Sequence, residues 1–423
     1  MGRRPIAIAL LGAGVRGVEI YGELVNRHPL GARVVAVADV DAGGAARAAA
    51  RLGGAATFES GEALLAAPRT ADAVIIATPD RSHADLAVRA IAGGYHVLLE
   101  KPIGTTPEEV LAVAEAARAS DVTVTVAHVL RYTDFFRTLK RLLAEKRIGR
   151  LVGIQHTENI GYWHFAHSFV RGNWRRADEA SPMILAKACH DLDLIRWFAG
   201  APALAVSSMG RRVWFRQENA PAGATARCTD GCPAELKCPY SAVRFYAGRH
   251  AGSTGWPVSA LGPDTTPAGV LRSLREGPYG RCVYRCDNDV ADHQVATIEF
   301  EGGVFGTLVV SALTALNTRT VKLVGSHGEL RGHMEKNEIE IHDFVTDKVE
   351  TLALAQQAGA HSGGDEGLID DFLRRLDQAR GGQPVPAAAS SLAESIDSHL
   401  LAFAAERARH ENIVVPMGDP TAR

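Results

Sequence analysis

The sequence has no long hydrophobic run and almost no net charge, and both absences narrow the classes of protein it can belong to. No apolar stretch reaches the roughly 18–20 residues that span a bilayer, so no transmembrane helix is predicted. The 46 Lys and Arg nearly balance the 48 Asp and Glu, which leaves a formal net charge of −2. Without a basic field, neither nucleic acid nor an anionic membrane is expected as a partner. We therefore expect a cytoplasmic protein that acts on a small molecule.

The chain is too long for a single core. It has 423 residues, of which 46% are apolar, and domains usually contain about 100–200 residues. Residues 1–127 alternate short apolar runs such as Ile6–Leu11 with helical patterns such as Thr106–Ala119. Repeated βα units of this kind predict a doubly wound parallel sheet.

The pattern changes after residue 127. The segment 128–423 reads as an α+β domain with a large, predominantly antiparallel sheet, because strand-like runs separated by glycine turns dominate from Gln294 onward. A single helix is predicted over Met183–Phe198, and a final one over Leu392–Arg409. Residues from about 200 to 290 are rich in Gly, Pro and Cys, and they read as an insertion.

A glycine motif follows the first predicted strand. Gly12, Gly14 and Gly17 form G-x-G-x-x-G between an apolar strand and a helix, which is the context that a dinucleotide-binding turn requires. The first glycine makes the tight turn, the second lets the backbone approach a pyrophosphate, and the third allows close packing. Amide N–H groups at the start of the helix, at Val15 and Arg16, would then face the phosphates.

An acidic residue ends the second predicted strand. Asp39 lies 22 residues after Gly17, where a carboxylate binds the adenosine ribose hydroxyls and repels a 2′-phosphate. This favours NAD over NADP. Arg16 argues in the other direction, because a nearby cation can accommodate the extra phosphate.

Glu100, Lys101 and Pro102 follow the predicted strand that ends at Leu99. The carboxyl edge of a parallel sheet is where ligands bind in such folds. A lysine in this place can bind a substrate oxygen or exchange its proton, although a charged pair before a rigid turn would look the same.

These motifs resemble the glucose–fructose oxidoreductase, inositol dehydrogenase and rhizopine-catabolism (Gfo/Idh/MocA) family over nearly the whole chain. The stretches that carry the resemblance are the glycine turn, Asp39, Thr78–His83, Gly94–Pro102, His190–Asp193, Gly325–Leu330 and Ser398–Leu400. The resemblance implies an active site between a Rossmann domain and the α+β domain. It places Thr78, Pro79 and His83 on the nicotinamide side, and it implies that Lys101 contacts both the nicotinamide ribose and the substrate.

The resemblance also implies an acid–base group on the helix after Met183. The family pattern there is often Asp followed by His four residues later, but this chain has Ala186 before His190. The hydroxyl proton of a substrate must still leave as a hydride moves, and His190, Lys187 and Lys101 are the candidate bases. On one continuous helix Lys187, His190 and Asp193 would share a face, so Asp193 would orient the imidazole or contact the substrate. A solvated polar helix face is the alternative.

Two further clusters are candidates for substrate contact. Tyr162, Trp163 and His164 form an aromatic segment after a predicted strand, and Arg171 and Trp174 follow it. Aromatic rings pack on the apolar faces of sugars, and cations bind hydroxyls or carboxylates. A core between the two domains would have the same composition.

The insertion holds five of the six cysteines, and the sequence resembles a cysteine-containing subgroup of the family. In a chain that is otherwise typical of the cytoplasm, such a cluster is more often a metal site than a set of disulfides. We expect Cys228, Cys232, Cys238 and Cys282 to bind structural Zn²⁺, with an iron–sulfur cluster or unligated thiols as alternatives.

The leading functional prediction is an NAD-dependent dehydrogenase that acts on a CH–OH group of a sugar or polyol. An oxidoreductive glycosidase with tightly bound NAD is the second reading, and a non-catalytic nucleotide-binding regulator is the third. A homodimer or homotetramer is expected, because the open face of the second sheet has to be covered.

Overall fold

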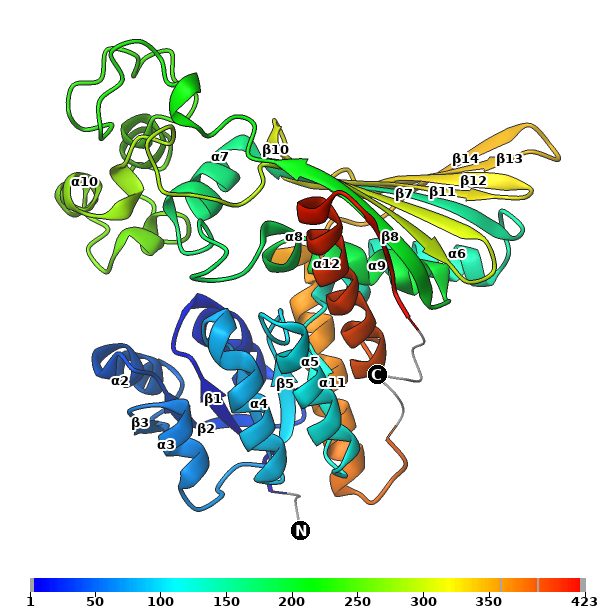
Figure 1. Ribbon diagram of the computed structural model, residues 1–423. Helices are drawn as coiled ribbons and strands as arrows, with labels where there is room; N and C mark the ends of the chain where they lie inside the picture. Colours follow the sequence, from blue (N-terminus) through cyan, green and yellow to red (C-terminus); the bar gives the residue numbers. More distant parts are fainter. Residues whose placement is uncertain (1–3, 358–359, 386–387, 419–423) are drawn as a thin grey trace.

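The computed structural model describes residues 4–357, 360–385 and 388–418, and its first sheet follows directly from the βα pattern (Figure 1). Six strands lie in the order β3-β2-β1-β4-β5-β6, and every neighbouring pair is parallel. β1 and β4 are fully buried, as expected for strands covered on both faces. This confirms the predicted doubly wound sheet. The strands are β1 (Ala7–Leu11), β2 (Arg33–Ala38), β3 (Ala56–Phe58), β4 (Ala73–Ile76), β5 (His96–Leu99) and β6 (Val124–Val126).

Helices cover both faces of this sheet. The glycine turn leads into a π-helical segment, Arg16–Gly22, which continues as α1. α5 begins with a capping box, in which the Thr106 side chain accepts the Glu109 N–H and the Glu109 carboxylate reaches back to the cap. The helices are α1 (Glu23–Arg27), α2 (Ala42–Arg51), α3 (Gly61–Ala66), α4 (His83–Ala92) and α5 (Pro107–Arg118).

The second sheet has nine strands in the order β14-β13-β12-β11-β7-β10-β9-β8-β15. β7 and β10 run parallel, and the other pairs are antiparallel, so the prediction of a predominantly antiparallel sheet is confirmed. α6 (Asp134–Ala144), α9 (Cys189–Ala199) and α12 (Leu392–Glu411) lie against one face, and the other face carries no helix in Figure 1. The strands are β7 (Leu151–Gly161), β8 (Ala203–Arg211), β9 (His293–Phe300), β10 (Val304–Thr314), β11 (Thr318–Gly325), β12 (Gly328–His333), β13 (Glu338–Asp343), β14 (Lys348–Ala353) and β15 (Val414–Pro416).

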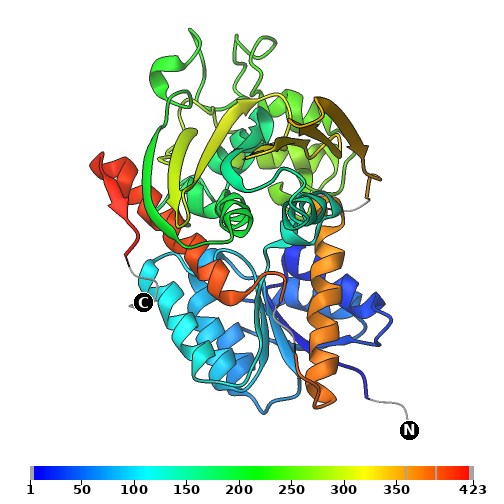
Figure 2. The same ribbon diagram turned by 90° about the vertical axis from the view of Figure 1, so that its right-hand side faces the viewer.

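The last two helices return to the first sheet, as Figure 2 shows in orange and red. α11 (Gly364–Arg380) and α12 (Leu392–Glu411) both lie beside it. Just before α12, the Ser390 hydroxyl donates to the Val126 carbonyl at 2.8 Å, and within α12 the His399 Nε2 accepts the Ile103 N–H at 3.0 Å. Residues far along the chain therefore complete the core under the first sheet. The domain limits 1–127 and 128–423 stay a prediction.

The predicted helix over Met183–Phe198 is wrong as a single element. The chain forms α8 (Met183–Ala186) and α9 (Cys189–Ala199) instead, because Ala188 leaves helical geometry at φ −94° and ψ 9°. The break lies between Lys187 and His190, so helical spacing across it no longer predicts a shared face.

The insertion forms a separate lobe with few regular elements. α7 (Tyr162–Phe165) lies beside it, and α10 (Pro267–Glu276) is its one α-helix among the described residues. A small core of Ala242, Tyr246, Val258, Val270 and Leu274 holds it together. No helix in the described ranges is long and apolar enough to cross a bilayer.

Arg131 lies in the 3-10 turn that connects the two sheets, and its side chain is completely buried. The guanidinium donates to both carboxylate oxygens of Asp193 in α9, at 2.6 and 2.8 Å. It also donates to the Ala389 carbonyl and to the Glu394 carboxylate of α12. One buried cation therefore links the turn to two helices of the second domain.

Replacement of Arg131 by Met should lower the free energy of unfolding by about 3–5 kcal/mol, because it leaves the buried Asp193 carboxylate without its partner. Urea unfolding followed by circular dichroism would measure the change. Arg141→Met removes the exposed ion pair with Glu145 and should change the same quantity by less than about 1 kcal/mol. Equal effects of the two variants would contradict this assignment.

Candidate active site

The glycine turn has the geometry that its three glycines predict. Gly12 has φ +100°, and a Cβ there would lie 2.4 Å from the Ala77 carbonyl oxygen. A Cβ on Gly17 would lie 2.1 Å from the Gly12 oxygen, so the turn closes only around glycine. Gly14 has no heavy atom within 4 Å of its Cβ position, and both it and Val15 are exposed. The open side of the turn is therefore where a pyrophosphate has room to approach.

Asp39 is held against this turn. Its carboxylate accepts the Ala13 N–H at 2.7 Å and the Asp41 N–H at 2.8 Å, and the side chain remains partly exposed. The carboxylate thus lies at the end of β2 beside the glycine turn, as the sequence predicts.

Arg16 points into the protein rather than toward a cofactor phosphate. Its guanidinium pairs with Glu100 at 2.7 Å and with Asp365 at 2.8 Å, and it donates to the Tyr21 hydroxyl. The Tyr21 hydroxyl in turn donates to Glu100 at 2.5 Å. Two carboxylates compensate the charge of Arg16, so the predicted role of its side chain at a 2′-phosphate loses its basis.

Glu100 joins this network to the predicted catalytic lysine. Burial alone would raise the pKa of the Glu100 carboxyl, but the charges of Arg16 and Lys101 and the bond from Tyr21 lower it to about 2. The ionised carboxylate accepts the Lys101 N–H at 2.9 Å. The Lys101 ammonium then donates to the Ala186 carbonyl at 2.9 Å. Lys101 therefore reaches from β5 to the end of α8, at the position where the family often has Asp.

His190 lies beside Lys101 at the start of α9. The imidazole is 6% exposed, and its Nδ1 has no hydrogen-bond partner among the described residues. Burial and the charge of Lys101 hold the pKa of His190 well below the ordinary value. The ring is therefore neutral at pH 7 and can accept a proton.

Two histidines that the sequence reasoning missed or set aside flank His190. The His128 ring lies 5.6 Å from it, and the His361 ring lies 6.2 Å from it. Neither nitrogen of buried His128 has a hydrogen-bond partner in the described part of the chain, although Nε2 lies 3.7 Å from the Asp193 carboxylate. Burial holds the pKa of its imidazole well below the usual range. His128 lies two residues after the end of β6, so its place at the carboxyl edge of the sheet was a usable signal. His361 is fixed by the Asp365 carboxylate at 3.0 Å.

Lys187 does not lie on the continuous helix with His190 that the sequence predicts, and its ammonium has an acidic partner. It lies in the break between α8 and α9, and its ammonium is 3.4 Å from the buried Glu158 carboxylate of β7. Burial lowers the pKa of the Lys187 ammonium. Arg319 of β11 pairs with both Glu158 and Asp191, at 2.8 and 2.7 Å. A chain of alternating charges therefore lies beneath Lys187. The helical spacing of Lys187 in the sequence did not predict these ion pairs.

Asp193 does not contact His190. Its carboxylate is bound by Arg131 through two hydrogen bonds and is fully buried. The structure therefore gives no support to the prediction that Asp193 orients the imidazole or contacts a substrate. His190 and Asp193 both lie in α9, but the Asp193 carboxylate is bound by Arg131.

The aromatic segment forms a wall with the insertion. Trp163 stacks on His164 and on Phe245, with ring centroids 5.5 and 5.4 Å apart. Among the influences that lower the pKa of His164, burial is the largest and the charge of Lys187 comes next, so this wall lies close to Lys187. Tyr162 accepts a hydrogen bond from Arg249 at 3.1 Å.

The residues expected on the nicotinamide side differ in their solvent exposure. His83 is buried with its two ring nitrogens 2.7 Å from the carbonyls of Thr78 and Pro102, so it clamps two loops together. Thr78 is partly exposed and Pro79 is exposed, beside that clamp. Trp174, from the second domain, donates to the Asp80 carboxylate at 3.2 Å and so reaches the same loop.

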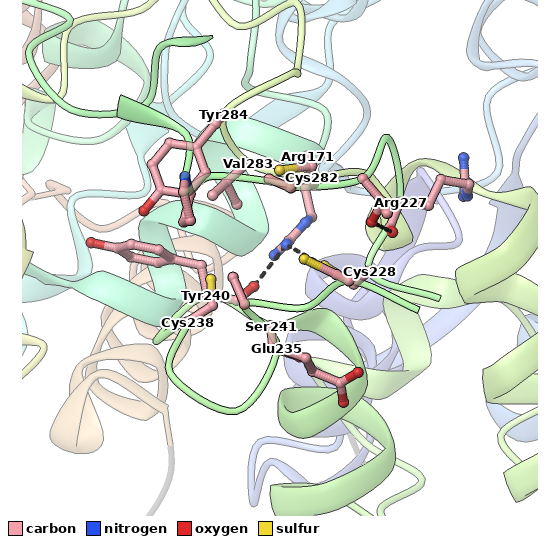
Figure 3. Close-up of a pocket in the computed structure, with 15 residues that line it drawn as sticks. Arg171, Arg227, Cys228, Glu235, Cys238, Tyr240, Ser241, Cys282, Val283 and Tyr284 are labelled. Carbon is pink, nitrogen blue, oxygen red and sulfur yellow. Dashed lines mark hydrogen bonds between the residues drawn. The ribbon is translucent and has the colours of Figure 1, made fainter. Parts of the chain in front are cut away.

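Arg171 lies away from this group. Its side chain is buried in the insertion among Cys228, Cys238 and Cys282 (Figure 3), so the structure gives no support to the prediction that it contacts the substrate. All six cysteines are free. Within the described ranges, no three His, Cys, Asp or Glu side chains are arranged to hold a metal ion as they stand, so the structure does not support the zinc prediction.

Comparison with known proteins agrees with this arrangement. Residues 6–128 match the model of the Gfo/Idh/MocA oxidoreductase family, NAD-binding Rossmann fold, and residues 140–410 match its C-terminal alpha/beta domain. The Bacillus subtilis protein YteT is 26% identical over 73% of this chain and 73% of its own. Inositol 2-dehydrogenase 2 of Saccharopolyspora erythraea is 33% identical, over 46% of this chain and 53% of that enzyme.

Solved structures share the fold at low identity. A levoglucosan dehydrogenase in complex with NADH and levoglucosan superposes with a TM-score of 0.71 at 18% identity, covering 98% of this chain and 100% of its own. An oxidoreductase from Agrobacterium radiobacter in complex with NAD⁺, L-tartaric acid and magnesium gives 0.69 at 17% identity, covering 98% and 99%.

Two glycine variants separate binding from folding. Gly14→Ala should leave the thermal midpoint within about 2 °C of the wild type, because its Cβ meets open space. It should weaken NADH binding at least about tenfold, since the methyl group occupies the approach to the pyrophosphate. Gly17→Ala should lower the midpoint itself. Scanning calorimetry and NADH fluorescence titration would measure both, and undiminished NADH binding by Gly14→Ala would contradict the assignment.

Proposed function

Because the chain belongs to the Gfo/Idh/MocA family of oxidoreductases, we propose that it transfers a hydride between a carbinol carbon of a sugar or polyol and the nicotinamide of NAD. The observation that carries the proposal is the contact of Lys101 with the Ala186 carbonyl. That contact brings a cation at the carboxyl edge of the parallel sheet to the helix end that precedes His190.

The residues present fit a dinucleotide. Gly12, Gly14 and Gly17 with the N–H groups of Val15 and Arg16 would hold the pyrophosphate, and Asp39 would bind the adenosine ribose. NAD is preferred to NADP, because Asp39 repels a 2′-phosphate and the Arg16 guanidinium is already paired with two carboxylates. When bound, NAD supplies the carbon that accepts or returns the hydride.

His190 is the base and Lys101 is the cation that binds the reacting oxygen. The neutral His190 imidazole takes the hydroxyl proton as the carbon is oxidised. The ammonium of Lys101, held near the ionised Glu100, stabilises negative charge on that oxygen. The His128 Nδ1, which has no hydrogen-bond partner in the described residues, offers a further hydrogen bond to a hydroxyl group. Protonation of His190 is favoured as the substrate oxygen becomes negative.

The aromatic and charged side chains near Lys101 and His190 support a sugar or polyol as the substrate class. Trp163 and His164 present stacked rings, and Lys187 lies beside them as a cation paired with Glu158. Aromatic faces pack on the C–H faces of sugar rings, and a cation binds their hydroxyl or carboxylate oxygens. Dehydrogenases of inositol and levoglucosan among the similar proteins support the same class.

Purified protein should reduce NAD⁺ with at least one member of a panel of sugars, inositols, uronates and anhydrosugars, followed by absorbance. Lys101→Met and His190→Asn should each lower kcat/KM by about 10²–10⁴-fold. Lys187→Met should raise KM more than it lowers kcat, because Lys187 binds and does not exchange the proton. Lys348→Met, on the exposed strand β14, is the matched surface control and should leave all three constants unchanged.

The panel also distinguishes the other two readings. Cleavage of glycosides without accumulation of NADH would contradict the dehydrogenase and identify an oxidoreductive glycosidase. Tight NAD binding without turnover of any substrate would instead identify a non-catalytic nucleotide-binding protein.

The pH dependence tests the base. A base acts only when deprotonated, so kcat/KM for oxidation should fall as the pH drops through the pKa of His190. Burial and the Lys101 charge lower that pKa below its ordinary value of 6.5, so the acid limb should have its midpoint below pH 6.5. His190→Asn should remove the limb. A midpoint above pH 7 in the wild-type protein would point to a lysine as the base.

A homodimer or homotetramer through the open face of the nine-stranded sheet remains our expectation. Met209, Phe305 and Leu313 on that face are 80%, 52% and 43% exposed. Apolar side chains on an uncovered sheet face are typical of an interface between subunits.

A further inference from the structure

One tryptophan of the insertion stays in contact with solvent although several rings pack against it. Trp256 is 45% exposed, and it does not belong to the small core that holds the insertion together. Its ring contacts in the described part of the chain are with Trp163, His164 and His167. These three belong to α7 and to the helical segment directly after it. Trp256 therefore packs outside its own lobe, and the exposed part of so large an apolar ring needs an explanation.

Trp163, His164 and Trp256 form a group of rings that we call the aromatic corner. The planes of Trp163 and His164 are 26° apart, and Trp163 also stacks on Phe245. The Trp256 ring is inclined to Trp163 by 53° and to His164 by 76°, with centroid distances of 5.5 and 5.2 Å. A T-shaped contact with His167 at 5.3 Å further fixes the Trp256 ring. A ligand that packs on Trp256 does not have to order this side chain first, which favours binding.

The aromatic corner lies at the end of the sheet where Lys187 has its partner. Glu158, which pairs with Lys187, is in β7, and α7 follows β7 directly. On the neighbouring strand β11, Arg319 is in register with Glu158. Asn317, two residues before Arg319, has its side-chain oxygen 3.1 Å from the His164 Nδ1. Both strands therefore connect the Lys187 ion pair with the aromatic corner over a few residues.

Polar side chains surround the aromatic corner. The exposed Arg249 donates to the Tyr162 hydroxyl at 3.1 Å, and a guanidinium has further N–H donors for a ligand. The partly exposed His250 packs on Phe245 with the ring centroids 4.7 Å apart. Asn317 is exposed beside His164. An aromatic ring bordered by hydrogen-bonding groups suits a sugar, which has an apolar C–H face and hydroxyls at its edge.

The insertion supplies most of this surface. It lies between β8 and β9, and Figure 1 shows it as a lobe beside α7. Lys101, His190 and Lys187, which we place around the reacting ring, come from elements outside it. The insertion therefore extends the site on the side of Lys187 rather than forming its centre. The side chains that it contributes around the aromatic corner are Phe245, Arg249, His250 and Trp256.

We propose that the aromatic corner binds a second sugar ring, so that the substrate is a disaccharide whose other ring is oxidised at Lys101 and His190. The proposal rests on the proposed function for the place of the reacting ring. The C–H face of the second ring packs on Trp256, and Arg249 and Asn317 bind its hydroxyls. No bond is formed or broken at the aromatic corner, so Trp256 determines specificity and is not a catalytic residue.

A binding measurement on full-length wild-type protein with NADH tests this without turnover and without a variant. Isothermal titration calorimetry would compare cellobiose, maltose, lactose, trehalose and sucrose with glucose, galactose and fructose. At least one disaccharide should bind about tenfold or more tightly than either of its constituent monosaccharides, because it gains the contact with Trp256. If no disaccharide binds more tightly than its constituents, the proposal is overturned.

Variants then assign the gain to one side chain. Trp256→Ala should weaken binding of that disaccharide about tenfold and leave binding of the monosaccharides unchanged, whereas Trp256→Phe should retain most of the affinity. Trp214→Ala is the matched control, since Trp214 is 37% exposed in the same insertion but its ring contact is with Tyr284. Equal weakening of disaccharide and monosaccharide by Trp256→Ala, or the same loss in Trp214→Ala, would contradict the assignment.

The two proposals fail in different ways. Binding of a disaccharide that depends on Trp256, without reduction of NAD⁺ by any sugar, would remove the hydride transfer and leave the second-ring site in place. Oxidation of a monosaccharide with a kcat/KM equal to that of every disaccharide would leave the dehydrogenase in place and overturn the second-ring site.

Discussion

The buried Glu100 carboxylate is the interaction on which the arrangement of the site depends. A carboxylate without solvent is stable only when it is paired and hydrogen-bonded, and here Arg16, Tyr21 and the Lys101 backbone supply those contacts. Arg16 also pairs with Asp365, which fixes His361. One ionised group therefore holds the helix after the glycine turn, the lysine at the end of β5 and the start of α11 in a single network. These three segments cannot move independently without breaking the network.

Short sequence patterns predicted the features of this protein that depend on residues close together in the chain. The glycine turn needs a positive φ at Gly12 and close packing at Gly17, and both requirements are visible in the sequence. A strand end and a family motif mark Lys101 and His190 in the sequence, and their catalytic roles stay a prediction. The side chains of Arg16, Asp193 and Arg171 were misplaced, because their partners lie 84, 62 and 110 residues away in the chain. No periodicity reports a contact over such distances.

The helix break at Lys187 is the clearest example of a feature that the sequence pattern did not predict. Intrinsic propensity favours a continuous helix over Met183–Phe198, since the segment contains no glycine or proline after Pro182. Tertiary contacts override it: Lys187 turns toward Glu158, and the Ala186 carbonyl becomes the acceptor for Lys101. The acceptor for Lys101 is thus an uncharged backbone oxygen rather than a carboxylate.

One apolar core runs through both halves of the molecule. Ile8 and Leu10 of β1 belong to the same buried cluster as Phe372 of α11, Leu401 of α12 and Leu308 of β10. Because both halves share this core, the chain has no position at which it can be divided without cutting through buried contacts. A fragment ending near residue 127 would lose the part of its core that α11 and α12 supply and expose apolar side chains to water. Chimeras that exchange nucleotide-binding halves between relatives would therefore have to carry α11 and α12 along with the first half.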